Sequence, residues 1–189
     1  MLGDLKRGSY FLKATLIFIV FKKSQNMEQE KKNANVIAAG QGEVLSIAGG
    51  SYRIMVSGSE TDGAYATIEM TVPPGGGPGP HAHAGFHETF YVLEGEVEIK
   101  TETGRYTATA GSYASIPTGG IVHGFKNNSD KLARLLCTVV PAGLEEFFTE
   151  VAKLAEAAKD KPNQPPDMQK INAIAEKYGQ KLYPPDYLE

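Results

Sequence analysis

Apolar and polar positions alternate in short runs between Gly42 and Val140, and this pattern predicts β-strands. The runs are rich in Val, Ile, Thr, Tyr and Phe, and glycine-containing turns such as Asp62-Gly63 separate them. The predicted strands are Glu43–Ile47, Tyr52–Ser57, Ala64–Val72, Thr89–Leu93, Glu96–Thr101, Arg105–Ala108, Tyr113–Ile116, Val122–Lys126 and Ala133–Val140. Many short strands at close spacing indicate an all-β sandwich or closed barrel.

Two amphipathic segments follow the strands and predict two α-helices. The apolar stripe of the first consists of Leu144, Phe147, Phe148, Val151, Leu154, Ala155 and Ala158. The prolines of Lys161–Pro166 end this helix, and Asp167 is placed to cap the second. The second stripe consists of Met168, Ile171, Ile174, Ala175 and Tyr178, and Gly179 stops the helix. Both stripes are expected to pack against the strands or against a partner subunit.

Composition and charge narrow the class of protein. The chain has 189 residues, of which 41% are hydrophobic and 22% charged, as expected for one globular domain with extra residues at its ends. The single cysteine, Cys137, excludes an internal disulfide framework and is expected to be a small core residue. Residues 1–33 carry seven Lys/Arg and three Asp/Glu, whereas the remainder carries 12 and 19. This acidic body argues against nucleic acid as a partner, because phosphate contacts need a basic surface.

The N-terminal residues 1–26 allow two interpretations. Their apolar stretch, Tyr10–Phe21, is too short to span a bilayer, since a spanning helix needs about 20 apolar residues. It has the outline of a signal peptide, but two lysines follow directly and no small-residue cleavage site appears. We interpret Met27 as the true start, and residues 1–36 as an extension that is disordered or lies upstream of that start. This interpretation predicts a cytoplasmic protein without stable membrane insertion, and a secretion or membrane-surface segment is the alternative.

Candidate chemistry is concentrated in the four histidines and one glutamate. His81, His83 and His87 lie beside Glu88, and His123 comes from a distant strand. Residues i and i+2 of a strand point to one face, so His81 and His83 direct two imidazoles into one volume. A bend after them could return Glu88 to the same place, and a closed barrel could place His123 opposite. Such a ligand set suits one divalent Fe, Mn, Co, Ni, Cu or Zn ion and leaves positions open for water, substrate or O₂.

The spacing around these residues follows a regular pattern. Gly75 is followed by five residues, His81-x-His83, four residues, Glu88, six residues and Gly95. This order and spacing resemble the first sequence motif of the cupin superfamily.

A second set of residues resembles the second cupin motif, which runs Gly, five residues, Pro-x-Gly, two residues, His, three residues, Asn. The matching residues are Gly111, Pro117, Gly119, His123 and Asn127. One departure is that three residues separate Gly119 from His123, where two are expected. A one-residue bulge before His123 could absorb the difference.

The resemblance implies a fold and a ligand set. Cupins have a double-stranded β-helix, or jelly-roll, barrel, so residues 37–141 are expected to form this barrel and residues 142–189 a helical tail packed on it. The residues that bind metal in cupins correspond here to His81, His83, Glu88 and His123. The segments around the motifs look like those of single-domain, quercetin-dioxygenase-like cupins. They are Thr61-Asp62-Gly63-Ala64, Pro73-Pro74-Gly75-Gly76-Gly77, Pro141–Phe148, Tyr178-Gly179 and Tyr183-Pro184-Pro185.

Other residues near the motifs keep two interpretations each. Strand alternation makes Phe90, Val92, Ile116 and Phe125 either substrate-pocket residues or plain barrel core. His87 points away from Glu88 in an extended segment, so it either supports one of the ligands from behind or lies on the surface. Asn127 is expected to be a turn residue or a hydrogen-bonding residue near the site.

The resemblance implies a metal-dependent, dioxygenase-like oxidoreductase acting on a small phenolic, enol or flavonol-like substrate with O₂. Glu88, the only acid in the set, would be both metal ligand and proton acceptor. The alternatives are a non-oxidative isomerase or lyase that uses the metal as a Lewis acid, and a small-molecule-binding protein without turnover. Edge strands and the added helices make a homodimer plausible.

Overall fold

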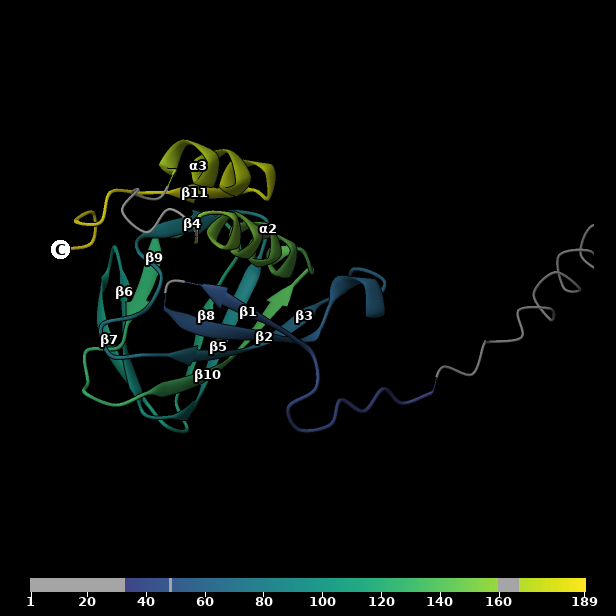
Figure 1. Ribbon diagram of the computed structural model, residues 1–189. Coiled ribbons are helices and arrows are strands. Elements are labelled where there is room, and N and C mark those ends of the chain that lie inside the picture. Colours follow the sequence, from purple (N-terminus) through teal and green to yellow (C-terminus); the bar gives the residue numbers. More distant parts are fainter. Residues whose placement is uncertain (1–32, 48, 160–166) are drawn as a thin grey trace, which may run out of the picture. The chain divides into compact units, whose positions relative to one another are not determined.

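The computed structural model of the protein describes residues 33–47, 49–159 and 167–189 (Figure 1). The chain divides into two compact units, Met1–Val36 and Ile37–Glu189, and the elements below belong to the second. The interpretations of Tyr10–Phe21, of Met27 and of the proline break fall on residues outside the described ranges. Neither of the helices described below has the length and apolar character that crossing a bilayer requires, and the described ranges hold no other candidate.

The strands form two facing sheets, as expected for a jelly roll. The six-stranded sheet has the order β1 (Glu43–Ile47), β2 (Gly50–Val56), β3 (Ala66–Val72), β10 (Ala133–Val140), β5 (His87–Glu94) and β8 (Tyr113–Ile116). The five-stranded sheet has the order β11 (Gln180–Leu182), β4 (His81–His83), β9 (His123–Lys126), β6 (Glu96–Thr101) and β7 (Gly104–Thr109). All paired strands are antiparallel. The all-β jelly-roll prediction is confirmed, although within the described residues the two sheets do not join into one closed barrel.

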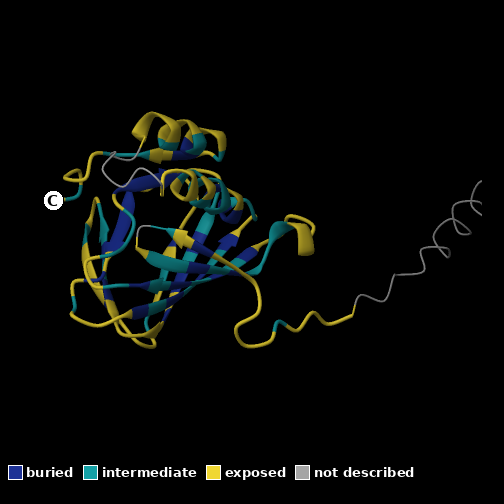
Figure 2. Ribbon diagram, viewed as in Figure 1, coloured by how far each residue is buried: buried dark blue, intermediate teal, exposed yellow. Residues whose placement is uncertain are grey.

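Alternating side chains of the central strands form the core between the sheets. In β3 and β10 every second residue is buried, so Ile68, Met70, Leu135 and Cys137 point inward. Figure 2 shows this burial as dark blue segments in the middle of the strands. The strand period of two thus converts the apolar pattern of the sequence into one buried layer.

The observed strands match the predicted ones within about two residues at each end, and two further strands appear. One is β4, which was expected only as an extended His-x-His segment. The other is β11, whose three residues contain one apolar side chain, so no alternation could reveal it.

Two helices follow the strands, as predicted, at one side of this unit (Figure 1). The first is α2 (Leu144–Ala157), whose Phe148 ring meets Tyr52 of β2 edge-on at a centroid distance of 5.0 Å. The second is α3 (Met168–Lys177), which begins after Asp167, whose side chain accepts a hydrogen bond from the Lys170 backbone N–H at 3.1 Å. A short 3-10 helix, η1 (Gly58–Glu60), lies in the connection between β2 and β3.

Candidate metal centre

Three histidines from two neighbouring strands face one another at one end of the core. His81 and His83 lie on β4, and His81 is the register partner of His123 on β9. The ring of His123 lies 4.3 Å from that of His81 and 4.8 Å from that of His83, measured between centroids. Cross-strand partners share a face, so the antiparallel pairing of β4 and β9 gathers the three imidazoles.

Glu88 reaches the same point from the opposite sheet. A bend at Ala84-Gly85 reverses the chain after β4, and Glu88 is the second residue of β5. Its Oε2 atom lies 3.1 Å from Nε2 of both His83 and His123. One ligand atom from each of the four residues can be chosen so that all lie within 4.8 Å of one another. The bend and the convergence expected from the sequence are therefore present.

Backbone contacts fix which nitrogen of each ring faces the cluster. Nδ1 of His81 lies 2.9 Å from the carbonyl of Gly79, and Nδ1 of His123 lies 2.9 Å from the carbonyl of Ile121. A carbonyl only accepts, so in both rings Nδ1 donates and the neutral form has a bare lone pair at Nε2. In His123 this lone pair would face the Glu88 carboxylate. A metal ion or a proton between them relieves the repulsion, and donation from Nδ1 to a carbonyl is the usual arrangement of metal-binding histidines.

Burial and charge set the protonation of the cluster. Burial raises the pKa of Glu88, but hydrogen bonds with His123 and His83 outweigh it and hold this pKa well below its usual range. Burial, together with the neighbouring His123, lowers the pKa of His81 to about 4. Near neutral pH, Glu88 is an anion and His81 is neutral, as metal coordination requires. The four side chains therefore fit a divalent transition metal.

The spacing between Gly119 and His123 is one residue longer than in the second cupin motif. A turn, and not a bulge, accommodates the extra residue. Gly119 and Gly120 have positive φ angles of 114° and 84°, which glycine adopts without strain. His123 still reaches the cluster, and Ile121 in the same loop accepts its Nδ1 hydrogen bond.

The comparisons with known proteins agree with this geometry. A family model described as "Cupin domain" matches residues 68–139, a range that holds all four cluster residues. The chain contains a cupin domain. The quercetin 2,3-dioxygenase of Bacillus subtilis is 27% identical to this cupin over 113 residues, which are 60% of this chain and 33% of the relative. The chain thus spans about a third of the length of the curated relative that it matches.

Solved structures resemble this cupin in fold. A protein of Thermotoga maritima described as a predicted oxalate decarboxylase has a TM-score of 0.50 and 21% identity, over 57% of this chain and 99% of the other. The polyketide cyclase RemF of Streptomyces resistomycificus has a TM-score of 0.52 and 20% identity, over 57% and 80%. An RmlC-like cupin of Shewanella frigidimarina has a TM-score of 0.51 and 21% identity, over 60% and 96%. At these identities the likeness concerns the fold alone.

Cys137 contributes a contact to the cupin's cluster that the sequence did not reveal. It is fully buried on β10, as expected of a core residue, and its thiol donates a hydrogen bond to Oε1 of Glu88 at an S···O distance of 3.3 Å. Burial, reinforced by the charge of Glu88, raises the pKa of this thiol well above its ordinary value of 9.0. The thiol therefore stays protonated and can donate this hydrogen bond. Cys137 is distant from Glu88 in the chain, so this contact could be predicted only from knowledge of which strands pair.

His87 and Asn127 lie outside the cluster. Nε2 of His87 lies 2.8 Å from the hydroxyl of Ser115 on β8, and the side chain is partly exposed. Asn127 is fully buried, and its amide donates to the carbonyls of Val72 and Lys131 and accepts from the backbone N–H of Ser129. These contacts hold loops together, and none of them reaches a cluster residue.

An apolar pocket of about 330 Å³ opens beside the cluster, and both His81 and Glu88 line it. Phe90 and Phe125 also line it, whereas Val92 and Ile116 are buried core residues outside its lining. The sequence left open whether these four residues line a pocket or belong to the core. Two of them line the pocket, and the other two belong to the core. Most other lining residues come from outside the matched domain, and the sequence did not indicate them. They are Ile47, Tyr52, Leu144, Phe147, Phe148, Val151, Met168, Gln180, Leu182, Tyr183 and Pro185.

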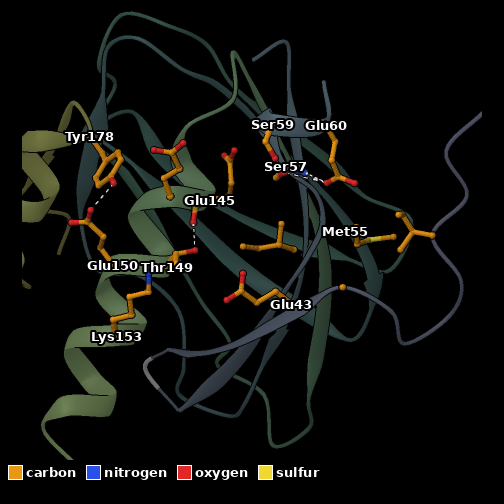
Figure 3. Close-up of a pocket in the computed structure, with 14 residues that line it drawn as sticks. Glu43, Met55, Ser57, Ser59, Glu60, Glu145, Thr149, Glu150, Lys153 and Tyr178 are labelled. Atoms are coloured by element: carbon orange, nitrogen blue, oxygen red, sulfur yellow. Dashed lines mark hydrogen bonds between the residues drawn. The ribbon is translucent and has the colours of Figure 1, made fainter. Parts of the chain in front are cut away.

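A second hollow, of about 470 Å³, lies between α2 and the β1–β2 region and has a polar, acidic lining (Figure 3). Several of its carboxylates are held by the fold. Glu145 accepts hydrogen bonds from the backbone N–H groups of Gly58 and Gly143, and Glu150 accepts from the hydroxyl of Tyr178. No member of the histidine–glutamate cluster lines it. These contacts join α2 to the connection between β2 and β3 and to the end of α3.

Proposed function

We propose that this cupin is a mononuclear metal-dependent oxidoreductase, dioxygenase-like, that acts on a small phenolic, enol or flavonol-like molecule with O₂. The observation that carries the proposal is a buried cluster of three histidines and one glutamate at the wall of an apolar pocket. The 27% identity to a quercetin 2,3-dioxygenase supports the oxidative class. The predicted homodimer and cytoplasmic location stay predictions.

His81, His83, Glu88 and His123 would hold the metal, through Nε2 of His81 and His123 and Oε2 of Glu88. A divalent transition metal at this place supplies an electrophilic centre that lowers the proton affinity of a bound oxygen and, where redox-active, can engage O₂.

The protein's own residues prepare the substrate. The aromatic walls, among them Phe90 and Phe125, would hold a flat ring and exclude water, which strengthens electrostatic interactions at the cluster. Among the described residues that line the pocket, Glu88 is the only one with a carboxylate. Its low pKa keeps it ionised but also makes it a weak base, so it would accept the proton of a phenol or enol whose own proton affinity a bound metal lowers.

Metal content tests the site directly. We expect near one transition metal per chain in wild-type protein purified without added metal or a histidine tag, and almost none in His83→Ala and Glu88→Ala. His87→Ala is the matched control, because this histidine bonds to Ser115 outside the cluster and should leave the metal content unchanged. Wild-type protein that stays empty after reconstitution would contradict the proposal.

Oxygen uptake tests the reaction class. Metal-loaded protein is expected to consume O₂ with members of a phenol, catechol and flavonol panel, and Glu88→Ala is expected to lose this activity. Turnover that continues unchanged under nitrogen would instead identify an isomerase or lyase.

A further inference from the structure

The short strand β11 lies beside the histidine strand β4. In this antiparallel ladder Gln180 pairs with His83, and Leu182 pairs with His81. Directly opposed residues of such a ladder share a face, with their Cβ atoms about 5 Å apart. Gln180 therefore projects from the C-terminal part of the chain to the side of the sheet that carries the histidine–glutamate cluster.

The amide of Gln180 is buried without satisfying its donor. The residue is 4% exposed, and its Nε2 has no hydrogen-bond partner in the part of the chain that the structure describes. Buried side-chain polar atoms are nearly always hydrogen-bonded, because an unpaired one costs stability. A leucine of similar size would avoid this cost. The amide has no partner among the described residues of the ligand-free fold, and Nδ1 of His83, the residue opposite it in the ladder, has none either.

The position of Gln180 in the pocket indicates what kind of partner would satisfy its amide. Gln180 lines the 330 Å³ pocket together with His81 and Glu88, and it is the only side-chain amide among the described lining residues. The lining is otherwise dominated by aromatic and aliphatic side chains. A few polar groups in an apolar pocket orient a ligand and select for its polar atoms.

We propose that Gln180 donates a hydrogen bond to a second oxygen of the substrate, next to the oxygen that reaches the metal. This inference rests on the proposed function and narrows its substrate class to ring compounds with two neighbouring oxygens, such as a catechol or an α-hydroxyketone. The short cross-strand distance between Gln180 and His83 suits neighbouring oxygens better than widely separated ones. A pocket near the lower end of the usual range of about 300–1,000 Å³ suits a small ligand.

Two chromogenic probes that differ by one hydroxyl group measure how much the second oxygen contributes to binding. 4-Nitrocatechol and 4-nitrophenol are titrated into zinc-loaded protein, in which the metal is redox-inactive and no turnover consumes the probe. The quantity compared is the ratio of the two dissociation constants. We expect Gln180→Leu to reduce the preference for 4-nitrocatechol about 10-fold, as for loss of a hydrogen bond to a charged group, with unchanged zinc content and unchanged 4-nitrophenol binding.

Two further variants serve as controls for the effect of Gln180→Leu. Gln180→Glu keeps the size but places a carboxylate next to an anionic oxygen, so it should weaken 4-nitrocatechol binding at least as much. Gln169→Leu makes the same substitution at an exposed site on α3 and should bind both probes like wild type. In the ligand-free protein, Gln180→Leu should melt at or above the wild-type temperature, because it removes an unpaired buried amide.

The outcomes distinguish this inference from the proposed function. An unchanged probe ratio in zinc-loaded Gln180→Leu and Gln180→Glu would overturn the role of Gln180 and leave the metal site intact. A lower melting temperature of ligand-free Gln180→Leu would show that the amide has a structural partner, which also overturns it. Wild-type protein that takes up no metal would overturn the proposed function, and the inference with it.

Discussion

At the scale of single residues, Cys137 contacts the proposed metal ligand Glu88 without being a ligand itself. Its thiol hydrogen-bonds Oε1 of Glu88, while Oε2 faces His83 and His123. The thiol thereby orients the carboxylate and leaves Oε2 on the side where the proposed metal would bind. Groups that orient a ligand in this way influence metal affinity by about 10–100-fold in other metalloproteins.

We therefore expect Cys137→Ala to weaken metal binding about 10-fold, because Glu88 loses its orienting donor. Cys137→Ser retains a donor of similar size and should keep most of the affinity. Competition with a chromogenic chelator measures both dissociation constants. Equal affinities of wild type and Cys137→Ala would show that the thiol is only a filler of the core.

At the scale of elements, Glu69 links three strands of the larger sheet. Its carboxylate on β3 receives Arg53 of β2 at 2.6 Å and Arg134 of β10 at 3.0 Å. Partial burial raises the pKa of Glu69, but the hydrogen bonds from the two arginines outweigh it and lower this pKa below its ordinary value of 4.5. A carboxyl group of this kind stabilises the fold fully above its unfolded-state pKa and less as the pH falls through the folded-state pKa.

Replacing Glu69 by Gln should lower the urea midpoint at pH 7, with a loss of about 1 kcal/mol or less because the pairs are partly solvated. The difference from wild type should shrink as the pH falls below 4.5, because the unfolded state of wild type then takes up a proton at Glu69 before the folded state does. It should be lost once the pH falls through the lower folded-state pKa, where Glu69 is uncharged in both states. Urea titrations of wild type and Glu69→Gln between pH 7 and pH 3.5 measure this. Glu96→Gln, at an exposed site on β6, is the control. A difference that stays constant over this range would contradict the ion-pair explanation.

At the scale of the whole molecule, the C-terminal segment supports the candidate metal centre, to which it contributes none of the four proposed ligands. The strand β4 pairs with β9 at a single register position, His81 with His123, but with β11 along all three of its residues. The helices α2 and α3 and the residues after them also supply much of the pocket wall. The candidate metal site and the pocket thus lie against a segment beyond the matched domain.

A chain that ends before Asp167 should retain its two sheets but bind metal at least about 10-fold more weakly, because β4 loses most of its ladder. Chelator competition and circular dichroism measure the two properties. A chain that ends after Tyr183 keeps β11 and serves as the control. Wild-type metal affinity in the shorter chain would show that β9 alone positions the histidines.

The sequence by itself determined the strand pattern, the two helices and the set of four candidate ligands. These features depend on local periodicity and on fixed spacing, which can be recognised in the sequence alone. His81 and His83, for example, share a face because side chains of a strand alternate with a period of two residues. Alternation also placed Phe90 and Val92 inside, but it could not tell which of them lies at the pocket and which lies deeper in the core. That distinction depends on where along the strand the opposite sheet and α2 end.

Only the tertiary structure decided the contacts between distant segments. The hydrogen bond from Cys137 to Glu88 and the pairing of Gln180 with His83 join residues 49 and 97 positions apart. Neither has a periodic signal, because β11 is three residues long and the cysteine is one inward residue among many. Register between strands fixes these neighbours, and register is set by the packing of the whole molecule.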